Sequence, residues 1–162
     1  MLYENYEQVV ANVKKACERS GRNFQDITII AVSKTKPLSD VEVLLSHGVM
    51  EFGENKVQEM VDKYEHVSKP VHWHLIGHLQ TNKVKYIVDK ACLIHSVDSV
   101  HLAKEIEKEA AKKGVVAKVL LEVNIAQEET KFGIREDEVY ALIDAIKDMP
   151  HVHVMGLMTI AP

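Results

Sequence analysis

The sequence predicts an α/β domain, a (β/α)8 barrel of the TIM type of which about six strands are present. A helical segment over residues 1–21 precedes six alternating strand and helix units over residues 27–157. That alternation favours a parallel sheet with right-handed crossovers. No GxGxxG turn follows a strand, which argues against a dinucleotide-binding, doubly wound sheet. Polar residues follow strand after strand, which suits a barrel mouth better than a single crevice.

The elements are expected in a regular order along the chain. A first helix over residues 3–20 ends at Gly21, which provides a C-cap. We expect strands over residues 27–34, 49–52, 71–76, 92–96, 115–123 and 151–157. We expect the later helices over about 37–47, 56–67, 83–89, 98–113 and 136–148, with a long polar loop over 124–135.

Size and composition predict one ordinary globular domain over residues 1–162. The chain is 46% hydrophobic and 27% charged, and no apolar run reaches membrane-spanning length. A net charge of -4 gives no general attraction to nucleic acid or anionic membranes. The acidic start does not resemble a secretory signal, and Cys17 and Cys92 form no CxxC pair. We therefore expect a cytoplasmic protein with two reduced thiols, although a disulfide stays open.

Lys34 is the residue around which the functional prediction is built. The apolar, β-branched run from Ile27 ends in Ser-Lys-Thr-Lys-Pro, and Pro37 stops strand pairing. Lysine is rarely buried, so its place at the end of a buried strand indicates a use for the amine. Burial and the nearby charge of Lys36 disfavour an ammonium, which frees the lone pair for an imine with a carbonyl ligand. The alternative is a surface lysine at a loop tip.

Four ordered motifs resemble the pyridoxal phosphate homeostasis protein family, the single-domain relative of the alanine racemase barrel. The resemblance covers nearly the whole chain and rests on Ala31–Pro37, Phe52–Glu59, Trp73–Lys83 and Gly156–Met158. It implies a (β/α) barrel that carries pyridoxal 5'-phosphate (PLP) as a Schiff base on Lys34. It also implies a protein that holds the cofactor and hands it on, with PLP-dependent apo-enzymes as recipients, rather than a robust enzyme.

The family continues with two more β/α units that hold the phosphate of the cofactor. This chain stops after the sixth expected strand, so we expect a barrel truncated at its C-terminal end. The first and sixth strands would then be unpaired edges. The sequence therefore predicts weaker cofactor binding than in a chain with all eight strands.

Further cofactor contacts are expected at Asn55, His74 and Met158. Asn55 can hydrogen-bond the cofactor or cap the following helix, and the two roles are compatible. His74 can stack near the cofactor ring, or it can be a buried histidine bonded to the backbone. The family match places Met158 near the ring, although methionine is more often core filler. Lys36 is the amine that competes with Lys34.

The loop over residues 124–135 is expected to lie over the barrel mouth as a lid. Lys131 is a possible second amine or anion contact, with Glu128 as its partner, and a solvated charge run is the alternative. Glu54 and Glu59 are expected to be charges at a helix start. Glu122 lies inside an apolar strand and needs a partner that the sequence does not name.

Two pairs of histidines raise the question of a metal. Each pair is spaced i, i+2, which puts both rings on one strand face. No third ligand accompanies either pair at a recognisable spacing, so no metal site is predicted. The pairs are His72 with His74 and His151 with His153.

Three other functions remain as alternatives to cofactor binding. A PLP-dependent amino-acid racemase or decarboxylase of the same fold is the first, but racemisation needs a second base that relatives take from another domain. An imine aldolase without a cofactor would need further acid and base groups around the lysine. In a pure protein-interaction domain, Lys34 would have no ligand. The sequence therefore favours a binding protein over an enzyme.

Overall fold

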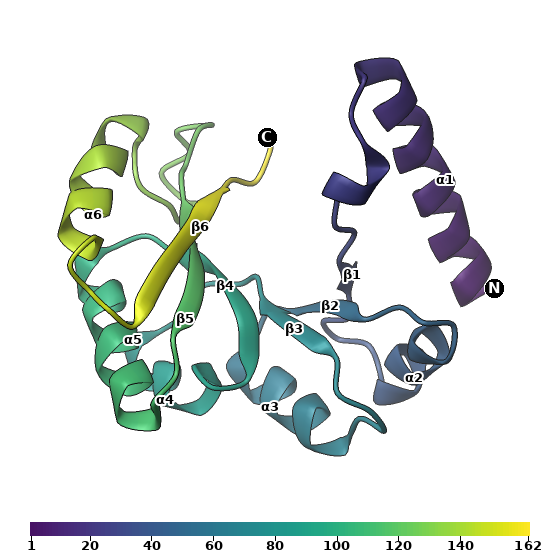
Figure 1. Ribbon diagram of the computed structural model, residues 1–162, viewed down its shortest axis with the longest axis horizontal. Helices are drawn as coiled ribbons and strands as arrows, with labels where there is room; N and C mark the ends of the chain where they lie inside the picture. Colours follow the sequence, from purple (N-terminus) through teal and green to yellow (C-terminus); the bar gives the residue numbers. More distant parts are fainter.

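The computed structural model describes residues 1–162 and contains one sheet of six parallel strands (Figure 1). The strands pair in chain order, β1-β2-β3-β4-β5-β6, and every pair is parallel. This order confirms the barrel type, because a doubly wound sheet reverses its strand order at a switch point. The strands are β1 Ala31–Val32, β2 Glu51–Glu54, β3 His72–Leu75, β4 Ala91–Val97, β5 Ala117–Glu122 and β6 Val152–Met158.

Helices follow the strands and cover one face of the sheet (Figure 1). Ser99 begins the longest of these covering helices, because its hydroxyl accepts a hydrogen bond from Leu102 N at 3.0 Å. No helix is both long and apolar enough to cross a membrane. The helices are α1 Leu2–Ser20, α2 Leu38–Ser46, α3 Val57–His66, α4 Val84–Ile87, α5 Val100–Lys113 and α6 Val139–Ile146, with 3-10 turns at Phe24–Asp26, Thr81–Lys83 and Glu136–Glu138.

The hydrophobic core lies between the sheet and its helices. Phe52 of β2 and Trp73 of β3 are almost completely buried, and their ring centroids are 5.9 Å apart. Side chains alternate across a strand, so the residues on either side of Phe52 face the opposite surface, which is the barrel interior. This alternation separates Glu51 from the helix layer and directs it inward.

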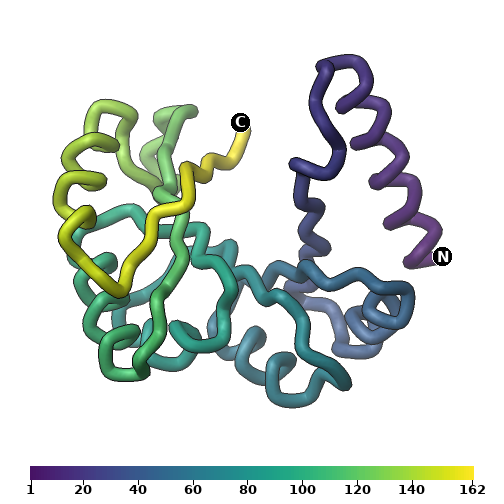
Figure 2. The backbone as a smooth tube through the Cα atoms, in the orientation of Figure 1, coloured from purple at the N-terminus to yellow at the C-terminus, as the bar shows by residue number.

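The sheet is not closed, and β1 and β6 are its two edges. The backbone trace shows these strands apart, with the C-terminus beside the opening and the N-terminus at the outer end of α1 (Figure 2). Met155 and Leu157 of β6 are 53% and 59% exposed, which is unusual for apolar strand residues. They line a mainly apolar groove of about 670 Å³ between β6 and α6.

The first strand is shorter than the sequence predicts. Only Ala31 and Val32 belong to the ladder, whereas residues 27–34 were expected. Beyond Val32 the chain turns, because Lys36 N donates to Ser33 O at 3.1 Å. The expectation that the first strand continues to Lys34 is therefore wrong, since the strand ends at Val32. Because β1 is an edge strand, it pairs with β2 alone, and no second neighbouring strand extends its hydrogen-bonded ladder.

Candidate functional site

Lys34 lies in the turn that follows β1, and its side chain is exposed. Its Nζ atom takes part in none of the hydrogen bonds or ion pairs of the chain. Thr35, the next residue, has a φ of 60°, a left-handed conformation that is strained for a β-branched side chain. The hydroxyl of Thr35 donates to Lys34 O at 2.6 Å. The burial that the sequence predicted for Lys34 is therefore wrong, because the structure shows an exposed, unpaired amine on a tightly constrained turn.

A buried lysine on α3 holds this turn from the helix side. Lys63 Nζ donates to Ser33 O at 2.7 Å, to Glu54 Oε2 at 3.0 Å and to Glu59 Oε2 at 3.1 Å. Glu59 Oε2 also accepts from Thr35 N at 2.7 Å. The backbone on both sides of Lys34 is therefore tied to the same ion network.

The carboxylates of this network have different surroundings. Burial raises the pKa of Glu54, and hydrogen bonds from Ser33 and Lys63 offset only part of that effect. Burial would also raise the pKa of Glu59, but hydrogen bonds from Lys63 and Thr35 N outweigh it and hold that pKa below its usual range. The expectation that Glu54 and Glu59 are helix-start charges is wrong for Glu54, whose side chain is fully buried and paired with Lys63.

Asn55 lies at the carboxyl end of β2 and is exposed at the barrel rim. It does not cap α3, since Lys56 occupies the N-cap position, so that expectation is wrong. A Cβ atom at Gly77 would lie 2.4 Å from Asn55 O and 2.7 Å from Asn55 Oδ1. Only glycine allows the ends of β2 and β3 to approach this closely. The amide of Asn55 is free of protein side-chain partners.

Met158 and Glu122 lie opposite each other at the end of the sheet. They are register partners on β6 and β5, and Val123 N donates to Met158 O at 2.8 Å. Burial, and then repulsion by Asp98, raise the pKa of Glu122. Its carboxylate accepts no hydrogen bond from another side chain. The structure therefore provides no basic partner of the kind that the sequence called for. Glu122 borders a cavity of about 390 Å³.

Glu128 and Lys131 border the same cavity, on the loop between β5 and α6. Their backbones are joined, because Lys131 N donates to Glu128 O at 3.0 Å, but their side chains form no ion pair. The ring of Phe132 stacks on that of His78 with centroids 3.9 Å apart. The loop therefore reaches from the end of β5 to the segment after β3, as expected of a lid.

His74 lies deeper, on the interior face of β3. Its Nε2 is 2.8 Å from Glu51 Oε1 and its Nδ1 is 2.9 Å from His95 Nε2. His72 also hydrogen-bonds Glu51. Burial, and then the neighbouring His74, lower the pKa of His95 to about 4. The expectation that His74 bonds the backbone is therefore wrong, because its partners are side chains from β2 and β4.

Cys92 of β4 is the third residue near Glu51 and His74. Burial, and then the charge of Glu51, raise the pKa of its thiol to about 11. It is not joined to Cys17, since both cysteines are free. The second histidine pair does not converge, because His151 bonds Glu107 at 2.6 Å while His153 is exposed.

The structure brings Lys34, Asn55 and Met158 to the carboxyl edge of the sheet and leaves His74 within the barrel. Sequence reasoning missed Lys63. Its signal was present, because α3 buries Val57, Met60 and Lys63, which are three residues apart along one face. A lysine on an otherwise apolar helix face predicts a buried counter-ion.

The sequence matches the family described as alanine racemase, N-terminal domain, over residues 5–162. Fold and match together define a β/α barrel domain of that class. The pyridoxal phosphate homeostasis protein of Aquifex aeolicus is 43% identical over 160 residues, which are 98% of this chain and 70% of the relative. The chain belongs to the pyridoxal phosphate homeostasis protein family.

Two solved structures are similar to the whole of this chain. A protein of unknown function from Bifidobacterium adolescentis superposes with a TM-score of 0.91 at 29% identity, covering 99% of this chain and 69% of that one. PipY of Synechococcus elongatus with PLP bound superposes with a TM-score of 0.78 at 32% identity, covering 94% and 71%. The second of these neighbours holds the cofactor that the resemblance implies.

Proposed function

We propose that this chain binds PLP as a Schiff base on Lys34 and serves vitamin B6 and amino-acid homeostasis, without acting as a robust enzyme. One observation carries the proposal. An unpaired lysine amine stands on a turn whose backbone is tied on both sides to the buried ion network of Glu54, Glu59 and Lys63. The names of the relatives and the PLP-bound neighbour support the same cofactor.

The constrained turn is what a lysine that binds a ligand covalently requires. A left-handed, β-branched residue such as Thr35 costs about 1–3 kcal/mol, and it persists only where surrounding contacts fix it. Here those contacts are the hydrogen bonds to Ser33 O and Thr35 N. Because the backbone is already fixed before the ligand binds, less conformational entropy is lost on binding.

The residues at the rim fit an aldehyde ligand. When bound, PLP would supply an aldehyde, and Lys34 is the residue that would hold it through its amine nitrogen, in a C=N bond whose formation releases one water molecule. Asn55, at the carboxyl end of β2, offers an unpaired amide at this rim, whereas Met158 ends β6 at the opposite edge of the open sheet, so its contact with the cofactor ring stays a prediction. Both ring nitrogens of His74 already contact side chains, so its stacking near the cofactor ring stays a prediction.

Lys36, Glu128 and Lys131 are secondary candidates. Lys36 follows Lys34 by two residues and is exposed, so it competes for the aldehyde. Lys131 lines the cavity below the loop and could attract the phosphate of the cofactor, with Glu128 on the opposite wall. The expected weakness of binding relative to a chain with eight strands also stays a prediction, to be measured by titrating both chains with PLP.

An exposed attachment point suits the holding and release of a cofactor. Recipients would be PLP-dependent apo-enzymes in the cytoplasm. Turnover of an amino acid as a racemase or decarboxylase would instead need acid and base groups placed on both faces of the substrate. An assay for exchange of the α-proton of amino acids in heavy water separates the two roles. Exchange well above that of free PLP would contradict the binding role.

A spectroscopic titration tests the assignment of the amine. Wild type, Lys34→Ala and Lys36→Ala are each titrated with PLP, and the visible absorbance of the Schiff base is followed. We expect the yellow colour to disappear in Lys34→Ala and to persist in Lys36→Ala. Retention of the colour in Lys34→Ala, with loss in Lys36→Ala, would show that the neighbouring lysine is the attachment point.

A further inference from the structure

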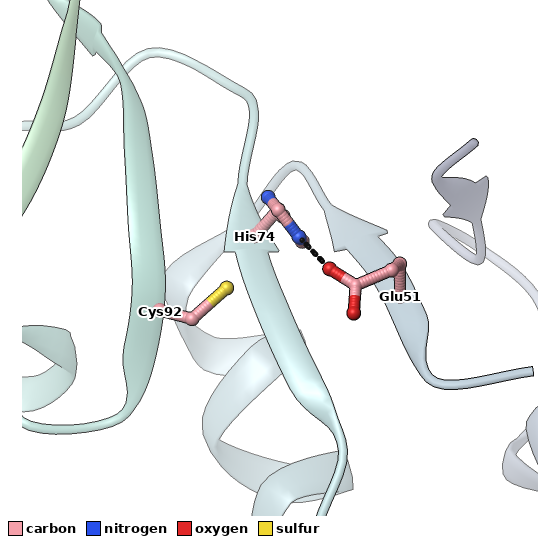
Figure 3. Close-up of side chains that lie close together, drawn as sticks. All are labelled: Glu51, His74 and Cys92. Carbon is pink, nitrogen blue, oxygen red and sulfur yellow. Dashed lines mark hydrogen bonds and ion pairs between the residues drawn. The ribbon is translucent and has the colours of Figure 1, made fainter. Parts of the chain in front are cut away.

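The barrel interior holds a second group of chemically reactive side chains, away from Lys34. Glu51 of β2, His74 of β3 and Cys92 of β4 point toward a common space (Figure 3). One ligand atom from each residue lies within 4.8 Å of the other two. Glu51 begins β2, whereas Lys34 follows the carboxyl end of β1, so the two groups occupy different levels of the barrel.

Three adjacent parallel strands bring these residues together, which explains why sequence spacing hid them. β2 and β3 pair with Gly53 opposite His74. Glu51 lies two residues before Gly53 on β2, so its side chain is on the same interior face as that of His74. Cys92 falls at the register shift between β3 and β4, where Trp73 pairs with Ala91 and His74 with Leu93. The irregularity admits an extra residue between two ladder pairs, and that residue is Cys92.

The imidazole of His74 is held in one orientation. Its Nδ1 is 2.9 Å from His95 Nε2, and the two rings meet edge to face with centroids 5.1 Å apart. Its Nε2 is thereby directed at Glu51 Oε1, 2.8 Å away. Proteins commonly orient a metal-binding histidine in this way, by a hydrogen bond to the ring nitrogen that does not bind the metal.

Hydrogen bonding within the group leaves one member unexplained. The carboxylate of Glu51 is satisfied by His74 and His72, but the thiol of Cys92 has no hydrogen-bond partner although it is half-buried. A carboxylate, an imidazole and a thiol are together the donor set that Zn²⁺ prefers. One carboxylate and one thiolate would also neutralise both charges of the ion.

We propose that Glu51, His74 and Cys92 form a binding site for a divalent cation of the Zn²⁺ class, with a fourth position left to water. Binding forms bonds from the metal to Glu51 oxygen, His74 Nε2 and Cys92 sulfur. The thiol proton passes to solvent, and His74 takes the tautomer that carries its single proton on Nδ1, so Nε2 has a free lone pair for the metal and Nδ1–H donates to His95 Nε2. No redox partner is needed, because Zn²⁺ keeps its oxidation state.

Cobalt(II) titration of the 162-residue chain after chelator treatment tests the site, since Co²⁺ reports thiolate ligation by a charge-transfer band. We expect one equivalent of Co²⁺ to give this band and one equivalent of Zn²⁺ to displace it. Cys17→Ser, which removes a cysteine of α1, serves as the matched control and should keep the band. Cys92→Ser should lose it, and His95→Gln should weaken binding by about 10–100-fold.

If circular dichroism shows that Cys92→Ser is unfolded, Glu51→Gln replaces it, because that variant keeps the thiol. We then expect at least about tenfold weaker binding of Co²⁺. Absence of the band in wild type, its survival in Cys92→Ser, its loss in Cys17→Ser or unchanged affinity in folded Glu51→Gln would each overturn the proposal. None of these readouts uses PLP, so failure here leaves the assignment of Lys34 untouched.

Discussion

Two glutamates of β2, three residues apart, meet opposite surroundings. Glu54 faces α3, is fully buried and forms an ion pair with Lys63. Glu51 faces the barrel interior, keeps about a quarter of its side chain exposed and contacts two histidines. The first carboxylate is paired with a lysine amine, whereas the second is hydrogen-bonded to two imidazole rings. One strand thus contributes to a fixed scaffold on one face and to an adaptable site on the other.

The pKa shifts of the two carboxyl groups follow the same division. Burial raises the pKa of Glu54 despite its ion pair. Burial would raise that of Glu51 too, but hydrogen bonds from His74 and His72 outweigh it and leave the pKa low. Glu51 is therefore an anion at neutral pH with exchangeable partners, and that is the state in which it can bind a cation.

Removing Lys63 should have the largest effect. Lys63→Met leaves Glu54 buried without a counter-ion, and breaking a buried pair costs about 3–5 kcal/mol. We expect the free energy of unfolding in urea to fall by that order and the PLP Schiff base to form less readily. Lys56→Met, at the exposed N-cap of the same helix, is the control and should change neither quantity.

A double variant separates charge from packing in this network. Glu54→Gln combined with Lys63→Met removes both buried charges, so most of the lost stability should return. If the double variant is no more stable than Lys63→Met alone, the lysine contributes through its packing and its bond to Ser33 O, and the description of Glu54 as its obligate partner fails.

The two glutamates should differ when each is changed to glutamine. Glu54→Gln leaves Lys63 with Glu59 as its remaining carboxylate, and we expect a loss of about 1–3 kcal/mol. Glu51→Gln changes a partly exposed group, so we expect less than about 1 kcal/mol in protein without metal. Equal losses in urea unfolding would remove the contrast between the two faces of β2.

Much of the fold was predictable from the sequence, because strand and helix periodicity alternate cleanly and Gly21 ends the first helix as a left-handed C-cap. The end of β1 was not, since an edge strand lacks the second neighbour that would extend it. Asn55 lies directly after β2, as expected, whereas the first strand ends at Val32, two residues before Lys34. Lys63 was missed although the buried face of α3 carried its signal, and Cys92 was missed because it lies at the register shift between β3 and β4, which no local pattern reveals.

Glu122 gives the smallest effect, and one that depends on pH. Its folded-state pKa is raised, so its protonated form is favoured by folding, and stability from this group is lost as pH rises above the unfolded value of 4.5 toward the folded one. The stability of Glu122→Gln relative to wild type should therefore be greater at pH 8 than at pH 5. A constant difference in urea midpoint at both pH values would argue that this carboxyl group is not perturbed.

The most direct measurement of the central claim is the site of covalent attachment. The 162-residue chain is incubated with PLP, reduced with borohydride, digested and mapped by mass spectrometry. The account predicts a pyridoxyl adduct on the peptide that contains Lys34, at the nitrogen of that residue. An adduct confined to Lys36 or Lys131, or no adduct with excess cofactor, would contradict it.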